Sequence, residues 1–576
     1  MTGPDAQDEP APAPAPDQPA ADAPASDNPL SEAVVQTPGE VQASPRRGGL
    51  MRSSMIYSGL TMVSRLMGFV RDLALTATLG ASATVAADAW NTALAFPNLF
   101  RRIFAEGAFA AAFVPAYAKK LAADGEEEAD VLAADAMAAL AAATIVLTLV
   151  AQLAMPWLMY LIAPGFAANP VKFKLAVVLT QITMPYLPCM AIYAHLSGVL
   201  QARGRFVVSA FAPTLLNLGI LLAVLPQRTP MGAAYAASFG ALGAGVAQAG
   251  LLWWGVRKSG ARVDLRWPRL TPEIRALIAL AIPGAIAASA TQINVFISGI
   301  LASQVNGART WLNVADRLYQ LPLGLVGVAI GVALLPRLST AVGAGDRREA
   351  QVATDEAITL ALAFTLPAAA ALCAMPFFLI DALFTRGEFG QADAIATSQA
   401  LFHYGWGTPA FVLTRVLAPA FFARGDTKAP MRFALISVAV QIALGILLFR
   451  LVGFQGIAAA TATASWITVV QMFVALSRRN LYHPSGAALA RIGKVILASV
   501  ALGVLMAVAS ALRSFYQPYL LRKEIAVLAV VALGGVAYVA LLFAVRAIKP
   551  ADLRKALKRP PRTKGSGSTE TLGDLS

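Results

Sequence analysis

Long apolar segments alternate with short polar loops over most of the chain, and this pattern limits the fold more than any other feature. A helix needs about 20 predominantly apolar residues to cross a bilayer, and only helices and closed barrels satisfy their backbone polar groups in lipid. With 57% hydrophobic and 14% charged residues, the chain has too little polar surface to cover a soluble globule. We therefore predict an all-α polytopic membrane protein with fourteen transmembrane helices, at residues 53–79, 83–118, 131–162, 173–200, 206–225, 231–256, 272–302, 310–335, 350–383, 394–422, 429–449, 454–476, 488–512 and 525–545.

Basic residues are distributed unevenly between the two sides of this predicted membrane domain. The loops and flanks after even-numbered spans carry twenty lysines and arginines, and those after odd-numbered spans carry nine. Because cytoplasmic loops are enriched in basic residues, both termini are predicted to be cytoplasmic. The formal net charge of +14 is spread over many short loops and forms no single stripe, so we discount nucleic-acid binding.

The two ends of the chain differ from its centre. Residues 1–49 are rich in alanine, proline and acidic residues without apolar periodicity, which predicts a disordered cytoplasmic tail. Residues 549–576 form a basic tail that we expect to lie against anionic lipid. Cys189, Cys373 and the three histidines are scattered, so the sequence indicates no disulfide framework, metal site or cofactor.

A weak internal repeat divides the spans into two sets. Pro115 and Pro336, Pro188 and Pro409, and the Ala-Arg-Gly motifs at residues 202–204 and 423–425 are all separated by the same sequence interval, which we call the repeat offset. Six spans lie within this offset, so the repeat relates spans one to six to spans seven to twelve in the same orientation. We predict an N-terminal lobe at 50–270, a C-terminal lobe at 271–480 and an additional helix pair at 481–548.

Charged side chains inside the predicted spans are the candidate functional residues. An ion at bilayer depth is costly unless it faces a wet cavity or a partner, so such residues usually mark a substrate path. Arginine is suited to a phosphate because its planar fork binds two oxygens and stays ionised. The surplus of arginines over carboxylates indicates an anionic substrate; the candidates are Arg65, Arg71, Asp72, Asp88, Arg101, Arg102, Glu106, Asp316, Arg317 and Arg415.

Several of these residues have a second interpretation. Arg65 and Asp72 are seven residues apart and share a helix face, and Arg102 and Glu106 are four apart, so each pair is also suited to an internal salt bridge. Arg415 lies nearer a helix end, where a long side chain can extend to the interface, and Asp88 is also explained as an interfacial charge. The sequence leaves these alternatives open.

At these residues the chain resembles the MurJ/MviN family of lipid II flippases. The resemblance rests on Ser64-Arg65-x-x-Gly68-x-x-Arg71-Asp72, Asp88-Ala89, the long motif from Pro97 to Pro115, residues 212–217, Ala315-Asp316-Arg317 and residues 416–424. It implies the fold of the MOP exporter superfamily, two six-helix lobes in a V plus two C-terminal helices that form a groove for the lipid tail. It also implies transport of lipid II, an undecaprenyl-pyrophosphate-linked peptidoglycan precursor, from the cytoplasmic to the periplasmic leaflet of the bacterial inner membrane by alternating access.

The resemblance further implies which residues bind the substrate. Arg65, Arg71, Asp88, Arg101, Arg102 and Arg317 would line a cationic cavity for the pyrophosphate and sugars, supported by Ser64, Asp72, Glu106, Asp316 and Arg415. Gln320 stands where we align a glutamate of the family, and Glu273 is the only carboxylate in spans seven and eleven, where some relatives bind sodium. The energy source therefore stays open. The sequence also leaves open whether cell-wall synthesis or division proteins are partners.

Three other functions compete with this interpretation. Another exporter of the same superfamily is the nearest, but exporters of cationic drugs need intramembrane acids, and here arginines dominate the central spans. A membrane enzyme acting on polyprenyl phosphates needs a cluster of acids, a metal site or an activated nucleophile, and the outer loops are too short to hold one. A non-transporting scaffold leaves the arginines within the spans without a purpose. We therefore expect a transporter and not an enzyme.

Overall fold

The computed structural model describes residues 47–102, 109–520 and 522–547, and within them all regular secondary structure is helical apart from one isolated bridge, Arg386–Phe389. The helices are α1 (Arg47–Leu79), α2 (Ala86–Phe100), α3 (Phe109–Ala123), α4 (Glu126–Ile162), η2 (Pro164–Ala168), α5 (Pro170–Thr183), α6 (Tyr186–Ala202), α7 (Val207–Val224), α8 (Pro230–Lys258), α9 (Pro272–Ser303), α10 (Ala308–Gly343), α11 (Arg347–Ala374), α12 (Pro376–Phe384), α13 (Gln391–Phe422), α14 (Lys428–Val452), α15 (Gln455–Arg478), α16 (Gly486–Ala511), α17 (Arg513–Tyr516), η3 (Gln517–Leu520) and α18 (Lys523–Ala544). The predicted all-α membrane fold is confirmed.

Each of the fourteen predicted segments coincides with one helix or with two consecutive helices. Within the described residues, nine helical segments are long and apolar enough to cross a membrane by length and composition alone. Three predicted segments are divided: 83–118 into α2 and α3, 173–200 into α5 and α6, and 350–383 into α11 and α12. Prolines explain two of the divisions. Pro185 has no N–H group with which to continue α5, and Met375, which precedes Pro376 at the start of α12, is held out of helical geometry.

The sequence repeat reappears in the helix boundaries. The starts of α4, α5 and α7 at Glu126, Pro170 and Val207 correspond, at the repeat offset, to the starts of α11, α13 and α14 at Arg347, Gln391 and Lys428. Gly204 and Gly425, which are also related by this offset, both have a φ of +71°, a left-handed conformation that favours glycine. We call α1–α8 the N-lobe and α9–α15 the C-lobe.

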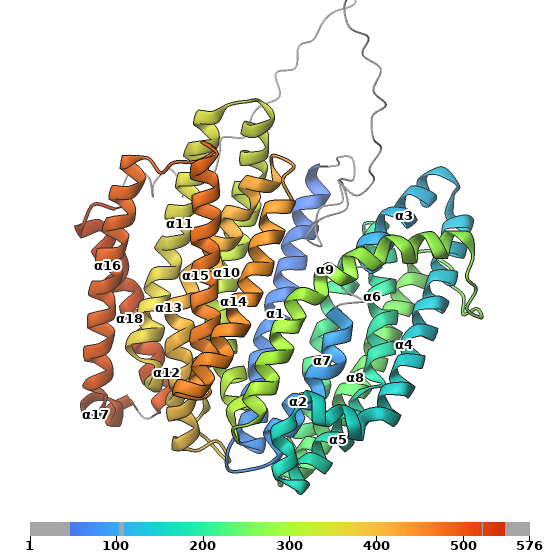
Figure 1. Ribbon diagram of the computed structural model, residues 1–576, viewed down its shortest axis with the longest axis horizontal. Helices are drawn as coiled ribbons and strands as arrows, with labels where there is room; N and C mark the ends of the chain where they lie inside the picture. Colours follow the sequence, from blue (N-terminus) through green and yellow to red (C-terminus); the bar gives the residue numbers. More distant parts are fainter. Residues whose placement is uncertain (1–46, 103–108, 521, 548–576) are drawn as a thin grey trace, which may run out of the picture.

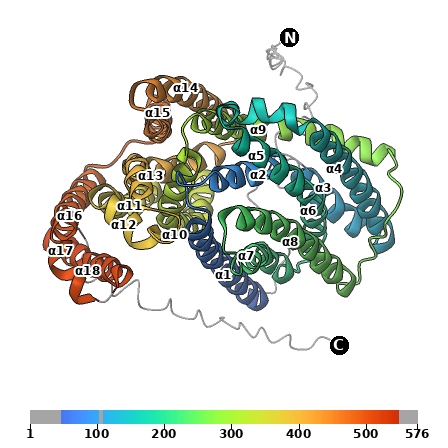
Figure 2. The ribbon, with the colours of Figure 1, turned by 90° about the horizontal axis from the view of Figure 1, so that it is seen from below.

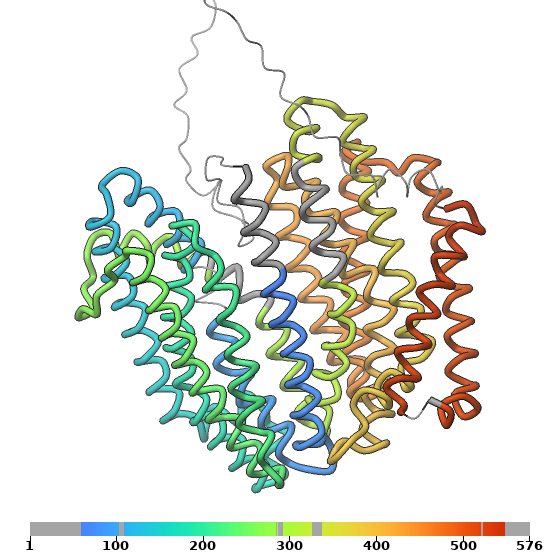
Figure 3. The backbone as a smooth tube through the Cα atoms, turned by 180° about the vertical axis from the view of Figure 1, so that it is seen from behind, coloured from blue at the N-terminus to red at the C-terminus, as the bar shows by residue number. Residues whose placement is uncertain are grey.

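The two lobes form separate bundles that lie closest at one end and diverge toward the other (Figures 1 and 3). The narrow end, at the bottom of Figure 1, holds the end of α1 and the starts of α2 and α10. The chain enters α1 and leaves α18 at the opposite, wide end. Both ends of the helical domain therefore lie on the same side, as an even number of membrane crossings requires.

Helix α9 belongs to the second repeat but crosses between the lobes. Its contacts include α3 and α4 of the N-lobe as well as α14 of the C-lobe, and Figure 1 shows it running obliquely between the bundles. Its repeat counterpart α1 packs mainly on α7 of its own lobe. At the N-terminal end of α9, just after the predicted domain boundary at residue 270, Glu273 Oε1 lies 2.5 Å from Lys120 Nζ of α3.

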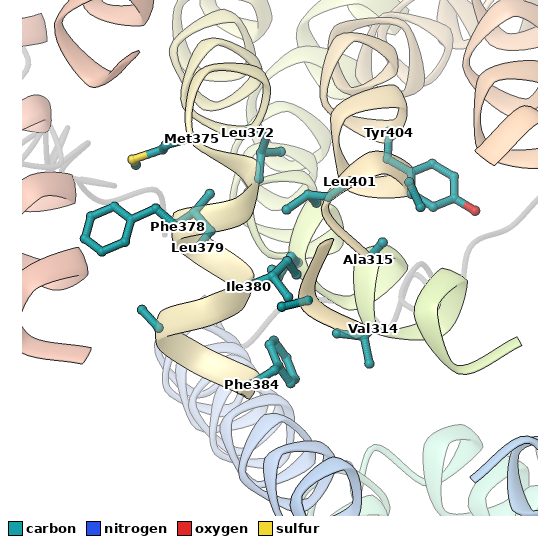
Figure 4. Close-up of a cluster of buried hydrophobic side chains, with 14 of the residues drawn as sticks. Val314, Ala315, Leu372, Met375, Phe378, Leu379, Ile380, Phe384, Leu401 and Tyr404 are labelled. Carbon is teal, nitrogen blue, oxygen red and sulfur yellow. The ribbon is translucent and has the colours of Figure 1, made fainter. Parts of the chain in front are cut away.

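The C-lobe is joined to the additional helix pair by a continuous apolar core. Figure 4 shows its centre, where side chains from α10, α11, α12 and α13 meet, including Leu372, Phe378 and Leu401. The same cluster extends to Val495 of α16 and Val527 of α18. Figure 2 shows these two helices at the outer edge of the C-lobe. On the opposite side, Phe69 of α1 packs edge-to-face on Phe384, with 5.9 Å between ring centroids.

Candidate functional site

Charged residues of α1 and α10 meet between the lobes. Asp72 Oδ1 accepts hydrogen bonds from Arg71 Nη2 at 2.6 Å and Arg71 Nε at 3.0 Å. Arg317 Nε of the C-lobe lies 2.9 Å from the other oxygen, Asp72 Oδ2. One carboxylate is therefore shared by two arginines, one from each lobe. Neither of them is Arg65, whose pairing with Asp72 was one of the alternatives that the sequence left open.

The three residues differ in accessibility. The Arg317 side chain is 44% exposed, whereas those of Asp72 and Arg71 are 14% and 8% exposed. Arg71 is turned toward α7, where its Nη1 donates to Asn217 Oδ1 at 2.8 Å. Of these three side chains, Arg317 thus presents the most surface, and Arg71 is largely buried against α7.

Arg65 also reaches across the lobes. Its side chain is exposed, and its guanidinium lies against Gly324 of α10, at a point where a Cβ atom would collide with it. A Cβ atom at position 324 would therefore require the Arg65 guanidinium to shift. Arg65 lies two helical turns from Asp72 on α1, so α1 meets α10 through charged side chains at two levels.

The remaining candidates lie around this centre. Arg101 and Arg102 form a π-helical turn at the end of α2, where Arg101 Nε donates to Asn98 Oδ1 at 3.1 Å and Arg102 is exposed. Glu106 lies outside the described residues, so its pairing with Arg102 stays a prediction. Asp316 accepts a hydrogen bond from Gln320 Nε2 one turn along α10, and Arg415 is exposed on α13.

Asp88 is fully buried at the narrow end and contacts the C-lobe. Its Oδ2 lies 2.6 Å from Lys172 Nζ and accepts from Gly307 N at 2.8 Å. Its Oδ1 accepts from Thr310 N at 3.1 Å and from Thr310 Oγ1 at 2.8 Å. The carboxylate thus caps the start of α10, where unpaired backbone N–H groups favour an anion. These contacts place Asp88 at a lobe–lobe contact rather than at a lipid–water interface.

A second carboxylate, Asp393 at the start of α13, makes the reciprocal contact. Its Oδ1 accepts from Ser82 Oγ at 2.5 Å and Ser82 N at 3.1 Å, both in the N-lobe, and from Trp311 Nε1 at 2.9 Å. We call Asp88 and Asp393 with these donors the interlobe junction. The sequence interpretation did not include Asp393 or Lys172, although the two positions are related by the repeat offset.

The interlobe junction leaves little space at the narrow end. A pocket of about 30 Å³ lies there, lined by residues of both lobes that include Asp72, Asn91, Asn313 and Arg317. This volume holds no more than one or two water molecules. The hydrogen bonds of Asp88 and Asp393 bridge the two lobes at this end, so the lobes are in contact here in the observed conformation.

Fold and site together define the class of this protein. Repeated helical lobes, ionisable residues at the level of the spans and a lobe–lobe contact at one end are the architecture of a membrane transporter. Arginine dominates the group between the lobes, as expected for an anionic substrate. Within the described residues, no group of three or more His, Cys, Asp or Glu side chains is arranged to hold a metal ion.

Comparison with known proteins specifies the family. The family model described as "Lipid II flippase MurJ" matches residues 75–530. A probable lipid II flippase MurJ of Rhizobium meliloti is 38% identical over 519 residues, which cover 88% of this chain and 96% of that protein. The lipid II flippase MurJ of Burkholderia cenocepacia is 32% identical over 445 residues, covering 76% of this chain and 85% of that protein. The chain therefore belongs to the MurJ family of lipid II flippases and is a transporter, not an enzyme.

Solved structures agree with this fold. A lipid II flippase MurJ in an inward closed conformation superposes with a TM-score of 0.70 at 23% identity, covering 85% of this chain and 99% of that one. An inward-facing multidrug transporter of the MATE family, within the MOP superfamily, gives a TM-score of 0.61 at 14% identity, covering 74% and 98%. The predicted family and superfamily fold are thus confirmed, and the drug-exporter alternative shares the fold alone.

Proposed function

We propose that this flippase binds the pyrophosphate of lipid II between α1, α2 and α10 and moves it by alternating access. The observation that carries the proposal is the ion pair between Asp72 and Arg317, which joins the lobes through a carboxylate that an anionic substrate can replace. A pyrophosphate diester offers several oxygens, so it can engage Arg317 and a second arginine at once. Substrate binding would then change the contact between the lobes.

The charge balance favours an anion. Of the described candidates at this level, five are arginines (Arg65, Arg71, Arg101, Arg102 and Arg317) and two are carboxylates (Asp72 and Asp316), which leaves a formal excess of three positive charges. Such an excess between low-dielectric walls attracts anions strongly. Ser64 and Arg415 would support the site from α1 and α13. We assign Asp88 to closure of the narrow end, because its carboxylate is already occupied by Lys172, Gly307 and Thr310.

The orientation of the two ends in the membrane follows from the predicted topology. With both termini cytoplasmic in the bacterial inner membrane, the wide end faces the cytoplasm and the interlobe junction faces the periplasm. Reporter fusions after Arg269 and after Leu512 test this orientation. We expect cytoplasmic and periplasmic signals respectively, and two signals from the same side would contradict it.

The additional helices α16 and α18 are proposed to contact the polyprenyl tail. Their described surfaces expose leucines and valines such as Leu497, Val504 and Leu528, and each buried methylene contributes ~0.8 kcal/mol. Removing the chain after Arg479 should therefore reduce transport of long-chain lipid more than binding of a short-chain, water-soluble analogue. Equal loss of both in a folded protein would assign the pair another task.

Arg317 provides the direct test of the binding site. In proteoliposomes supplied with labelled lipid II, we expect Arg317→Ala to reduce transport at least tenfold, since a hydrogen bond to a charged group contributes about 1.5–3 kcal/mol. Arg317→Lys should restore little, because a lysine does not make the bidentate contact. Arg347→Ala, at the exposed start of α11, is the matched control and should transport normally. Normal transport by Arg317→Ala would refute the proposed site.

A further inference from the structure

Asn217 of α7 joins two turns of α1 with its single amide group. Its Oδ1 accepts from Arg71 Nη1 at 2.8 Å, and its Nδ2 donates to the backbone oxygen of Ser64 at 2.9 Å. The side chain is almost completely buried, with 8% of the residue exposed. An inverted amide would direct its NH₂ group at the guanidinium, donor against donor, so the two bonds specify one orientation.

The segment of α1 from Ser64 to Asp72, which we call the α1 motif, has two faces that differ in their contacts. Ser64, Gly68 and Arg71 lie on the face turned toward α7, and a Cβ atom at Gly68 would be 3.5 Å from the Asn217 amide nitrogen. The neighbouring face carries Arg65 and Asp72, which are directed toward Gly324 and Arg317 of α10. Asn217 therefore contacts only the first face, while the second face meets the opposite lobe.

Arg71 connects the two faces. Nη1 is bound by Asn217, while Nε and Nη2 are bound by Asp72, whose other oxygen pairs with Arg317. The chain of contacts thus runs from α7 through Arg71 and Asp72 to the exposed arginine of the C-lobe. A change at Asn217 acts on Arg317 through these two side chains and not by touching a ligand.

The chemical identity of Asn217 also matters. A carboxylate would hold Arg71 more tightly than an amide, but it would cancel one positive charge beside an anion-binding site. The neutral amide fixes the guanidinium and leaves the positive charge of the group unchanged. Arg71 itself has only 8% of its side chain exposed, so this fixed position determines how its charge is directed.

We propose that Asn217 is a positioning residue for substrate binding, holding Arg71 so that Asp72 and Arg317 are presented to the anionic group of the substrate. This inference rests on the proposed function. It gives the residues of the α1 motif two separate tasks. Ser64, Gly68 and Arg71 contact Asn217, whereas Arg65 and Asp72 contact the C-lobe.

The test compares variants that change charge and shape separately. Asn217→Asp keeps the size of the side chain and adds a negative charge, and Asn217→Ser removes the amide without adding charge. Initial transport rates in proteoliposomes, measured against the concentration of labelled lipid II, give KM and kcat separately. We expect Asn217→Asp to raise KM about tenfold, in line with one hydrogen bond to a charged group, and Asn217→Ser to raise it less.

A second substitution distinguishes positioning from packing. In a background of Asp72→Asn, which already removes the carboxylate between Arg71 and Arg317, Asn217→Asp should change KM by less than it does in the parent, because both substitutions act through Arg71. Asn169→Asp, at the N-cap of α5 where aspartate caps as well as asparagine, is the matched control with parental KM. Detergent-solubilised yield and melting temperature confirm folding of each variant.

Three results would overturn the proposal. These are a parental KM in a folded Asn217→Asp, a parental KM in Asn217→Ser, or an effect of Asn217→Asp on KM that is as large in the Asp72→Asn background as in the parent. If Arg317→Ala transports normally while the Asn217 variants do not, the binding site proposed above fails and the effect of Asn217 must act elsewhere. If Arg317→Ala is inactive and the Asn217 variants are normal, the site stands and this inference alone is wrong.

Discussion

Corresponding positions of the two lobes carry opposite charges. Asp88 and Lys172 of the N-lobe correspond, at the repeat offset, to Arg309 and Asp393 of the C-lobe. In the N-lobe the two side chains form a buried ion pair, with 2.6 Å between Lys172 Nζ and Asp88 Oδ2. In the C-lobe they separate: Arg309 Nη1 donates to Thr92 Oγ1 of α2, and Asp393 accepts from Ser82.

The reversed charges allow two lobes with the same backbone framework to make complementary contacts with each other. Two lobes with identical charges at the junction would place like charges opposite each other, and like charges at close range repel. With reversed charges, each lobe supplies a carboxylate that accepts from the other: Asp88 from Gly307 and Thr310, and Asp393 from Ser82. The backbone repeat is retained while the side chains become complementary.

Asp88→Ala tests the N-lobe half of the comparison and should have the largest effect. It leaves the buried Lys172 ammonium with the neutral acceptor Asn306 Oδ1, at 2.9 Å, and removes the cap of α10. Removing one partner of a buried ion pair typically costs about 3–5 kcal/mol. We expect a clear loss of melting temperature in detergent and faster thiol labelling of cysteines placed at the junction. Unchanged labelling and melting would show that the pair does not hold the lobes together.

Asp393→Asn tests the C-lobe half and should have a smaller effect. The donors to Asp393 in the described structure, Ser82, Trp311 and Gly390, are all neutral, so no cation is left uncompensated. The amide still accepts at one oxygen and loses the other acceptor, for which about 1–3 kcal/mol is expected. The same melting and labelling experiments should place this variant between the parent and Asp88→Ala. A loss equal to that of Asp88→Ala would contradict the view that Lys172 makes the two halves unequal.

The fold was more predictable than the site because its signals are local. Span length, apolar composition and proline positions lie within single segments, and the common repeat offset indicates the two lobes from the sequence alone. The broken helices were missed because apolar composition continues across Pro185 and Pro376. The apolar character of a span does not reveal whether its helix is continuous.

The site was predicted by residue type but not by pairing. Arg71, Asp72 and Arg317 were singled out as ions within spans, yet Asp72 pairs with Arg317 of the other lobe and not with Arg65 on its own helix. Lys172 and Asp393 escaped because each lies near a span end, where a charge is ordinary. Applying the repeat offset to every charged residue would have shown that Lys172 and Asp393 occupy corresponding positions. Asn217 was noticed only within a motif, because a neutral amide carries no charge signal.

The smallest expected effect concerns the loop after α6 and its counterpart after α13. Arg205 of the N-lobe donates to the Lys258 backbone oxygen at 3.5 Å, whereas its counterpart Asp426 accepts from Arg479 Nη1 at 2.5 Å. The Ala429 backbone N–H and then Arg479 lower the pKa of Asp426 below its ordinary value. The stability from this carboxylate is therefore present above the unfolded pKa of about 3.9 and is lost as pH falls through the lower folded pKa.

Substitutions at Asp426 and Arg205 test the charge difference between the lobes at a place where solvent screens the charges. Solvent reaches both side chains, with 48% of Arg479 and 27% of Asp426 exposed, so the pair should contribute less than about 1 kcal/mol. We expect Asp426→Asn to lower the melting temperature slightly at pH 7 and to lose part of the destabilisation that the parent shows on acidification below about pH 4. Arg205→Asp, which introduces the C-lobe pattern beside Lys258, should gain a few tenths of a kcal/mol at pH 7 and lose this gain in acid. Identical melting curves for parent and both variants at the two pH values would mean that, outside the interlobe junction, the charge difference between the lobes has no energetic consequence.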